Sequence, residues 1–251
     1  MDPQEGIGLN FLGEVVTWFT TASHWQGSNG IPHRVFEHVV MSAAAVGAAL
    51  VVALPPSLIL GHLRRFGSLA INVSNVGRAI PSFAVLVLAA QVLGIGAQPA
   101  FIALFVLAIP PLVTNSYVGM ADVDPEIRES AKGMGMTGWQ SIWRVELPVA
   151  LPVVLAGVRT AAVQVVATAT LAALVAWGGL GRYIIDGLAQ RDFVQVFAGA
   201  FLVAVLSILT ELFLALVQRL TVSAGLTQRH KGKNEPFVGA AATTATAAER
   251  T

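Results

Sequence analysis

Long apolar stretches that carry almost no charge set the strongest limit on how this sequence can fold. Five of them come near the length of a membrane span, at residues 39–60, 80–93, 100–118, 149–175 and 193–217. A helix needs about 20 apolar residues to cross a hydrocarbon core of about 30 Å. The second stretch is short unless its helix begins near Ala70, because Asn72, Asn75 and Arg78 interrupt the apolar run. The sequence therefore predicts an all-α, polytopic membrane protein with five transmembrane helices.

The amino-acid composition agrees with a membrane setting. Of the 251 residues, 55% are hydrophobic and only 12% are charged, whereas soluble domains carry about 25% charged residues. The mean hydropathy is +0.71. Cysteine is absent, which excludes a disulfide framework, thiol chemistry and a cysteine-based metal site. The net charge of +1 says little as a total, so the positions of the charges are more informative.

Lysine and arginine concentrate in the connections that would share one side of the membrane. The connections 61–79 and 120–147 and the tail from residue 218 hold eleven of them: Arg64, Arg65, Arg78, Arg128, Lys132, Arg144, Arg219, Arg229, Lys231, Lys233 and Arg250. The opposite side holds three: Arg34, Arg182 and Arg191. Positive charge stays on the cytoplasmic side. We therefore expect an extracytoplasmic N-terminus and a cytoplasmic C-terminus.

The N-terminal segment, residues 1–37, precedes the first span and is expected outside the cytoplasm. Over residues 7–25 the apolar side chains share one helical face and polar ones the other, which predicts an amphipathic helix lying flat at the interface with Trp18 and Trp25 at headgroup depth. The alternative is a sixth span, which Glu14 and the polar stripe disfavour. Residues 38–220 form the expected transmembrane domain. The Ala- and Thr-rich residues 221–251 are expected to be a disordered cytoplasmic tail.

Small residues and prolines inside the spans constrain helix packing. Ala43 and Gly47 stand four apart, as do Gly157 and Ala161, which suits close backbone approach in lipid and is interpreted as ordinary helix packing. Four prolines are expected to break or kink their helices: Pro55, Pro56, Pro110 and Pro111. Such breaks are tolerated where protein or a water-filled cavity satisfies the freed carbonyls, which suits a path through the protein without proving one.

The polar connection at residues 120–148 predicts a rigid helix–turn–helix. Asp124 and Pro125 form a helix start, and that helix should stop at Gly133 or Gly135, where the chain can adopt positive φ. Residues 137–140 have the spacing of a capping box that opens a second short helix. Leu147-Pro148 is expected to end this second helix and to start the next span. Such a rigid element suits mechanical coupling to a partner.

The same connection resembles the EAA loop of type I ABC importer permeases. The matching residues are Glu129, Ser130, Ala131, Gly135, Val145, Leu147 and Pro148, with Ser130 in place of Ala and Val145 in place of Ile. Residues 79–82, 156–161, 167–172 and 178–181 resemble the osmoprotectant branch, which carries glycine betaine, choline, carnitine and related compounds. The resemblance covers roughly residues 35–220 and implies a methionine-permease-like transmembrane fold in the plasma membrane of a prokaryote.

The resemblance also implies partners. These are two ATP-hydrolysing subunits docked on the 129–148 loops, a second permease subunit in a homodimer or heterodimer, and an extracytoplasmic substrate-binding protein. The chain has no GxxxxGK[ST] phosphate loop and no HExxH motif, so it is expected to be a non-catalytic subunit. We expect no cofactor, no metal and no nucleic-acid partner.

Two other functions compete with an osmoprotectant permease. One keeps the architecture and changes the cargo to methionine or another amino acid. The other is a stand-alone secondary transporter, which predicts inverted repeats and carboxylates near the membrane midplane. No Asp lies within a span away from its ends, and Glu211 is the one glutamate that could serve.

A few polar side chains lie within the spans. Arg159 and Glu211 are expected to approach each other near the cytoplasmic side as an intramembrane ion pair, because isolated charges at such depth are costly. The alternative is that Arg159 snorkels to the membrane surface. Gln164 and Thr168 share a helical face and line a pathway or hydrogen-bond between helices. Trp177 is the nearest aromatic face for a quaternary ammonium.

Overall fold

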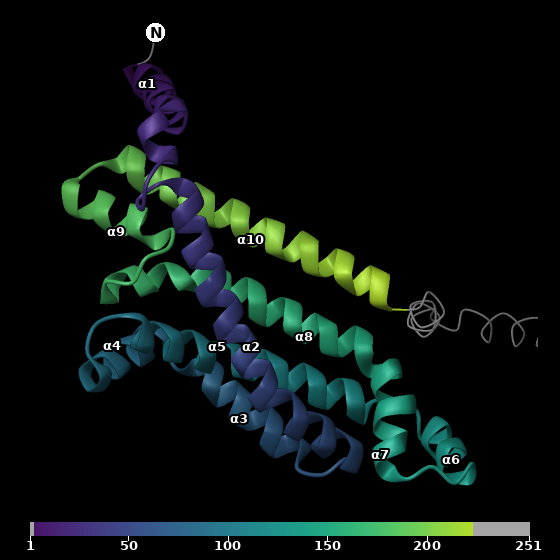
Figure 1. Ribbon diagram of the computed structural model, residues 1–251. Helices are drawn as coiled ribbons and strands as arrows, with labels where there is room; N and C mark the ends of the chain where they lie inside the picture. The colour runs from purple at the N-terminus through teal and green to yellow at the C-terminus, as the bar shows by residue number, and fades with distance from the viewer. Residues whose placement is uncertain (1–2, 223–251) are drawn as a thin grey trace, which may run out of the picture.

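Every regular element of residues 3–222, the part of the chain that the computed structural model describes, is a helix. The all-α prediction is confirmed for these residues. The elements, drawn in Figure 1, are α1 (Pro3–Thr20), η1 (Ala22–Trp25), α2 (Ile31–Leu63), α3 (Gly67–Ala79), α4 (Ser82–Leu93), α5 (Ala97–Ala121), α6 (Pro125–Gly133), α7 (Gly138–Ser141), η2 (Ile142–Glu146), α8 (Leu147–Thr168), η3 (Ala169–Val175), α9 (Gly181–Gln190) and α10 (Phe193–Thr221).

Four helical segments in the described part of the chain are long and apolar enough to cross a membrane. They are α2, α5, α10 and the continuous helical stretch Gly138–Val175, which contains α7, η2, α8 and η3. These correspond to four of the five predicted spans, and α2 is longer than expected because it begins at Ile31. The polytopic membrane class is therefore confirmed.

The predicted second span is two helices rather than one. α3 ends at Ala79, Ile80 and Pro81 are extended, and the apolar helix α4 begins at Ser82 with 12 residues. A residue before proline is pushed out of the α region by the proline ring, which explains why the helix breaks at Ile80. Both α3 and α4 pack on α5. How this pair crosses the membrane stays a prediction.

Helix α5 lies at the centre of the bundle and contacts α2, α8, α3 and α4. Its contacts with α2 and α8 are lined by small side chains with no exposed surface, such as Ala45, Ala49, Ala108 and Ala161. A Cβ atom added to Gly157 would lie 2.6 Å from the Asn115 Cβ and 3.0 Å from the Pro111 carbonyl oxygen. Gly157 therefore lets the α8 backbone meet α5 directly, as close packing in lipid requires.

The four prolines predicted to break or kink α2 and α5 lie within continuous helices. Helix α2 continues through Pro55 and Pro56, and α5 continues through Pro110 and Pro111, both of which are buried. Side chains nearby bond to backbone carbonyls: the Ser57 hydroxyl donates to Ala53 at 2.6 Å, and Asn115 Nδ2 donates to Pro111 at 2.8 Å. Neighbouring helices and such bonds stabilise proline-containing helices in the interior of membrane proteins.

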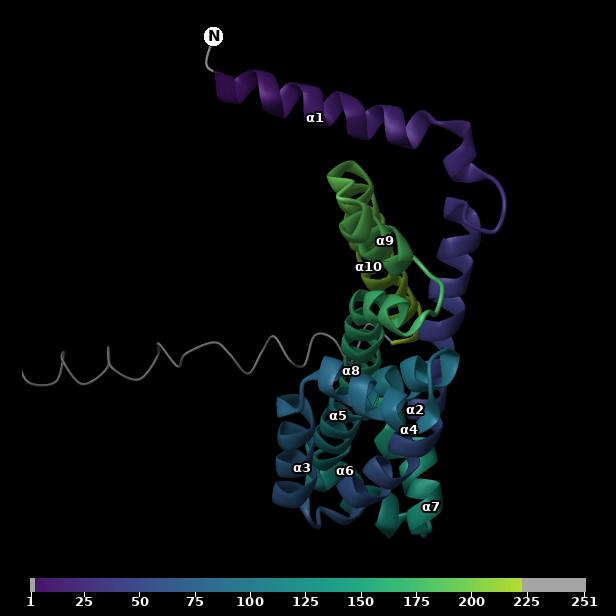
Figure 2. The ribbon, with the colours of Figure 1, turned by 90° about the vertical axis from the view of Figure 1, so that its left-hand side faces the viewer.

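Helix α1 crosses over the end of the bundle formed by α9 and α10, as Figure 2 shows. Its Phe11 ring packs edge-on against Phe197 of α10 at 5.5 Å. The helix ends at Thr20, and residues 22–25 form a separate 3-10 turn, so the predicted helix over 7–25 is too long. Trp18 is only 7% exposed and packs on Leu180 and Tyr183. This tryptophan is therefore a packing residue, and its depth in the membrane stays a prediction.

The two ends of the bundle carry different elements. α6 and α7 lie at one end, and α1 and α9 lie at the other, in both views (Figures 1 and 2). Helix α10 runs along the bundle and keeps an exposed apolar face that includes Leu209, Leu212 and Phe213. The predicted disordered tail, residues 221–251, lies outside the described residues except for Thr221 and Val222.

The contact between α5 and α8 predicts different effects for two glycines of the spans. Gly157→Ala should lower the free energy of unfolding by about 1–3 kcal/mol, because the new methyl group overlaps Asn115 and the Pro111 carbonyl. Gly47→Ala is the matched control, since no atom lies within 4 Å of its added Cβ. The apparent melting temperature of the detergent-solubilised protein measures both. Equal melting temperatures for the two variants would contradict the packing described above.

Candidate functional site

The loop at residues 124–148 begins with a capped helix. The Asp124 carboxylate accepts a hydrogen bond from the backbone N–H of Glu126 at 3.0 Å, and Pro125 occupies the first turn of α6. After Gly133 the chain turns at Gly135, whose φ is +79°. The turn is closed by bonds from Gly135 N to Lys132 O at 2.9 Å and from Met136 N to Ala131 O at 3.1 Å. The predicted helix start and glycine turn are both present.

The second half of the loop starts with the predicted capping box. The Thr137 hydroxyl accepts from Gln140 N at 3.3 Å, and Gln140 Oε1 accepts from Thr137 N at 2.9 Å. The expectation that Leu147-Pro148 ends this helix is wrong. α7 continues through the π-helical turn η2 into α8, with Leu147 N bonded to Ile142 O. Pro148 has no N–H to donate to an earlier carbonyl, and the wide turn just before it accommodates this loss.

A buried carboxylate lies beneath the loop. Glu146, the last residue of η2, has no exposed surface. Its Oε1 atom lies 2.7 Å from His62 Nδ1 at the end of α2 and accepts from the Ser141 hydroxyl at 2.8 Å. Its Oε2 atom lies 3.1 Å from an Arg128 guanidinium nitrogen of α6. We call Glu146, His62, Arg128 and Ser141 the loop anchor.

Arg128 extends the loop anchor to the ends of two spans. It donates to the His62 carbonyl of α2 at 2.8 Å and to the Met120 carbonyl of α5. Burial lowers the pKa of Arg128, and the adjacent Glu146 carboxylate opposes that shift. An arginine stays charged in proteins, so the loop anchor holds a permanent positive charge beside a buried carboxylate. Within residues 3–222, no three His, Asp or Glu side chains are placed to hold a metal ion.

The predicted loop residues divide between the interior and the surface. Ala131 is fully buried, Val145 and Leu147 are half-buried, and Glu129, Ser130, Gly135 and Pro148 are exposed. Three large apolar side chains that the sequence reading did not select are also exposed: Met134, Trp139 and Trp143. The two indole rings contact each other edge-on at 5.4 Å. Exposed aromatic side chains on a rigid element are typical of protein contact sites.

The structure brings Arg159 and Glu211 together. Arg159 Nε on α8 lies 3.0 Å from Glu211 Oε1 on α10. The Arg159 side chain is 34% exposed and the Glu211 side chain is 43% exposed. Gln218 joins them, because its Oε1 accepts from Arg159 at 3.2 Å and its Nε2 donates to the Pro152 carbonyl at 3.0 Å. These three side chains make a polar contact between two helices that are otherwise apolar where they meet.

The three predicted pathway residues are not gathered in one place. Thr168 lines a small cavity with Ser82, Leu86 and Leu171. Gln164 is half-buried one turn earlier on α8. Trp177 packs against the main apolar cluster at the end that carries α9, and its Nε1 is buried without a hydrogen-bond partner among the described residues.

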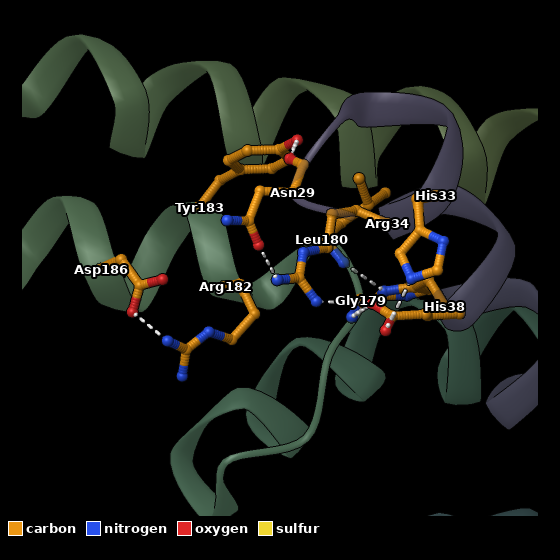
Figure 3. A network of polar contacts seen from close by, with 10 residues as sticks. Asn29, His33, Arg34, His38, Gly179, Leu180, Arg182, Tyr183 and Asp186 are labelled. Carbon is orange, nitrogen blue, oxygen red and sulfur yellow. Dashed lines mark hydrogen bonds and ion pairs between the residues drawn. The ribbon is translucent and has the colours of Figure 1, made fainter. Parts of the chain in front are cut away.

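A second polar network lies at the opposite end of α2, as Figure 3 shows. Glu37 Oε2 accepts from the Gly179 backbone N–H at 2.8 Å and from Arg34 at 2.7 Å. The fully buried His38 accepts from Leu180 N through Nδ1 at 3.3 Å, so its Nε2 donates to the Val166 carbonyl at 2.8 Å. We call this network the Gly178–Leu180 clamp.

The Gly178–Leu180 clamp explains two of the glycines of residues 178–181. A Cβ on Gly178 would lie 2.1 Å from Glu37 Oε2, and Gly179 has a φ of +81°. Tyr183 supports the turn by donating to the Asn29 carbonyl at 2.6 Å. Burial raises the pKa of Tyr183 to about 12, so the hydroxyl keeps its proton and remains a donor.

Sequence reasoning missed the residues at the centre of both networks. Glu146, His62, Glu37 and His38 stand next to apolar runs, where a charged or imidazole side chain has a strong need for a partner. Their position in the sequence could therefore have marked them as residues that need a polar partner. The sequence does not predict the partners themselves, because His62 and Glu146 are 84 residues apart and Glu37 and Gly179 are 142 apart.

Comparisons with known proteins give a consistent result. The family model described as "Binding-protein-dependent transport system inner membrane component" matches residues 45–222. The chain is 36% identical to the glycine betaine/carnitine/choline transport system permease protein OpuCB of Bacillus subtilis, over 77% of this chain and 89% of that protein. It is 36% identical to the carnitine transport permease protein OpuCB of Listeria monocytogenes, over 88% of this chain and 100% of that protein.

Two further comparisons extend this result. The chain is 36% identical to the osmoprotectant import permease protein OsmY of Salmonella typhimurium, over 71% of this chain and 76% of that protein. An inward-facing structure of the MetNI methionine ABC transporter has a chain that aligns with a TM-score of 0.67 at 22% identity, over 77% of this chain and 96% of that chain. The latter likeness shows the fold alone. The predicted resemblance to ABC importer permeases is confirmed, and this chain belongs to the family of inner membrane components of binding-protein-dependent transport systems.

Proposed function

We propose that this chain is the permease subunit of an ABC importer for osmoprotectants such as glycine betaine, choline or carnitine. The support for the cargo is the identity of 31–36% to permeases named for these compounds. The observation that carries the mechanism is the rigid loop 124–148, which presents exposed apolar side chains and is tied to the bundle by the buried Glu146. The chain forms the membrane path and leaves ATP hydrolysis to its partners.

The partners follow from the family and from the loop. Two ATP-hydrolysing subunits bind the loops of two permease subunits, and a substrate-binding protein delivers cargo from outside. The loop faces the cytoplasm and the N-terminus lies outside, because lysine and arginine are concentrated on the loop side of the spans. Helix α1 then lies along the outer surface. Met134, Trp139 and Trp143 supply the apolar contacts to the ATPase subunit.

The loop geometry suits direct transmission of force to the pathway. α7 is continuous with α8 through η2, so a displacement of the loop moves the start of α8 without an intervening flexible linker. When ATP binding draws the two ATPase subunits together, the two loops approach and the helices rotate. The path then opens to the outside and closes to the cytoplasm.

Selectivity for the cargo rests chiefly with the binding protein. A quaternary ammonium has no N–H donor, so its recognition depends on aromatic faces and negative charge. Gln164, Thr168 and Trp177 line the path, and only Trp177 among them offers an aromatic face. The path therefore provides a weak site. The methionine alternative rests on the fold of MetNI at 22% identity, which carries no information on cargo.

Uptake competition tests the cargo and the energy source together. In proteoliposomes that contain the complete complex, unlabelled glycine betaine, choline or carnitine should reduce uptake of a labelled osmoprotectant at least tenfold, whereas methionine should not. Omitting ATP should abolish uptake. Competition by methionine would favour an amino-acid permease, and uptake without ATP or ATPase subunits would favour a secondary transporter.

The glycine turn of the loop offers a test of coupling. Gly135→Val places a β-branched residue at a φ of +79°, a conformation that such residues rarely adopt, although no atom lies within 4 Å of the added Cβ. Uptake per ATP hydrolysed should fall at least tenfold in the assembled complex. Gly133→Val is the matched control, because Gly133 is helical and equally open. An uptake-to-hydrolysis ratio at the wild-type level in both variants would contradict a coupling role for the turn.

The ion pair between α8 and α10 offers a test of whether the two side chains act together in transport. Arg159→Glu and Glu211→Arg should each reduce uptake at least fivefold, since each places two like charges about 3 Å apart. The double swap should recover at least half of the loss. Recovery near zero, in protein that assembles normally, would mean that the two side chains act separately.

A further inference from the structure

The loop anchor contains the most deeply buried carboxylate among the described residues. Glu146 has no exposed surface, and it meets side chains from three other elements: His62 of α2, Arg128 of α6 and Ser141 of α7. Removing a carboxylate from water is costly, and a buried ion pair is often no more stable than apolar side chains of the same size. Such a group therefore points to a role other than stability.

We propose that Glu146 is a positioning residue that fixes loop 124–148 to the helix bundle, so that force applied to the loop reaches α2 and α8 together. This inference rests on the proposed function and adds a residue that the loop pattern does not contain. Glu146 is not expected to touch the ATPase subunit or the cargo. It acts by holding α6 and α7 in one orientation relative to the spans.

The packing of α6 explains why a polar anchor is needed. This helix contacts mainly α7 and η2, and Ala131 is its only fully buried apolar side chain. Apolar contacts of that kind let a helix slide over its neighbours, whereas hydrogen bonds and ion pairs fix the orientation of the helix. Arg128 reaches Glu146 and the carbonyl ends of α2 and α5 at once. Without the carboxylate, Arg128 would keep its bonds to α2 and α5 but would lose the ion pair that joins α6 to η2 and the start of α8.

The imidazole of His62 connects the same carboxylate to α2. Its Nδ1 lies 2.7 Å from Glu146 Oε1 and donates to it. On the other side of the ring, a Cβ added to Gly138 would lie 3.3 Å from Nε2, so the ring packs directly over the start of α7. The π-helical turn η2 ends at Glu146, and such turns are frequent at functional sites. Glu146 is thus the point where α2, α6, α7 and α8 meet.

A coupling measurement tests the proposal. Glu146→Gln keeps the size of the side chain and removes its charge. In the complete complex in proteoliposomes, ATP hydrolysis stimulated by the loaded binding protein should stay within about twofold of wild type, whereas uptake per ATP hydrolysed should fall at least tenfold. Glu14→Gln is the matched control at an exposed position of α1, outside the loop, and should leave both quantities unchanged. A wild-type uptake-to-hydrolysis ratio in Glu146→Gln would overturn the proposal.

A distance measurement separates positioning from mere stability and does not depend on transport. The chain has no cysteine, so Arg65→Cys and Lys132→Cys, both at exposed positions, accept spin labels for pulsed electron paramagnetic resonance. Adding Glu146→Gln should broaden or shift the distance between the labels by several ångströms. An unchanged distribution would overturn the proposal, even if the ATPase subunits fail to bind and the proposed function is lost.

A milder variant covers the case in which Glu146→Gln does not fold. Ser141→Ala removes one hydrogen bond to Glu146 Oε1 and leaves its contacts with His62 and Arg128 in place. Uptake per ATP hydrolysed should fall about twofold to threefold, and the spin-label distribution should broaden slightly. If both quantities match wild type, Glu146 does not position the loop.

Discussion

Close contact between α5 and its neighbours α2 and α8 is the constraint on which the rest of the structure depends. Lipid tails are as apolar as leucine, so helices in a bilayer associate through packing and polar contacts and not through the hydrophobic effect. Ala45, Ala108 and Ala161 have no exposed surface, and Gly157 lets backbone meet side chain across α5 and α8. This contact fixes where the ends of the three helices lie, and the polar networks form at those ends.

Both polar networks use α2, one at each end. At its start, Glu37 and His38 bind the backbone N–H groups of Gly179 and Leu180. At its other end, His62 binds Glu146 beneath the loop. Each network pairs charged or imidazole groups with backbone groups at turns or helix ends, which would otherwise be left unsatisfied. One helix therefore contacts both the turn that leads into α9 and the loop proposed to bind the ATPase subunits.

The proposed separation of roles, in which this chain forms the path and partner subunits hydrolyse ATP, agrees with the structure of the loop. The loop is rigid because a capped helix, a positive-φ glycine and a capping box follow one another. It is exposed where apolar side chains can meet a partner and buried where Glu146 meets the bundle. The residues proposed to line the path, by contrast, are few and scattered, which suits the proposal that the binding protein selects the cargo.

The local features of the loop were predictable because each depends on residues close in sequence. The Asp124 cap, the turn at Gly135 and the box at Thr137 and Gln140 are all present. The continuity of α7 with α8 was not predictable, because proline normally interrupts a helix and the π turn that accommodates Pro148 leaves no sequence signal. The same holds for α2 and α5, which continue through paired prolines within a packed bundle.

The sequence by itself determined the class of the protein, the spans other than the second, the caps of the loop and the family pattern. These follow from hydropathy and from hydrogen bonds between residues at most a few positions apart. Only the tertiary structure decided that Trp18 is a packing residue, that Arg159 meets Glu211, and that Glu146 and Glu37 are the centres of two networks. Trp18 and Tyr183 are 165 residues apart, Glu37 and Gly179 are 142 apart, and Arg159 and Glu211 are 52 apart, and the packing of helices brings such groups into contact.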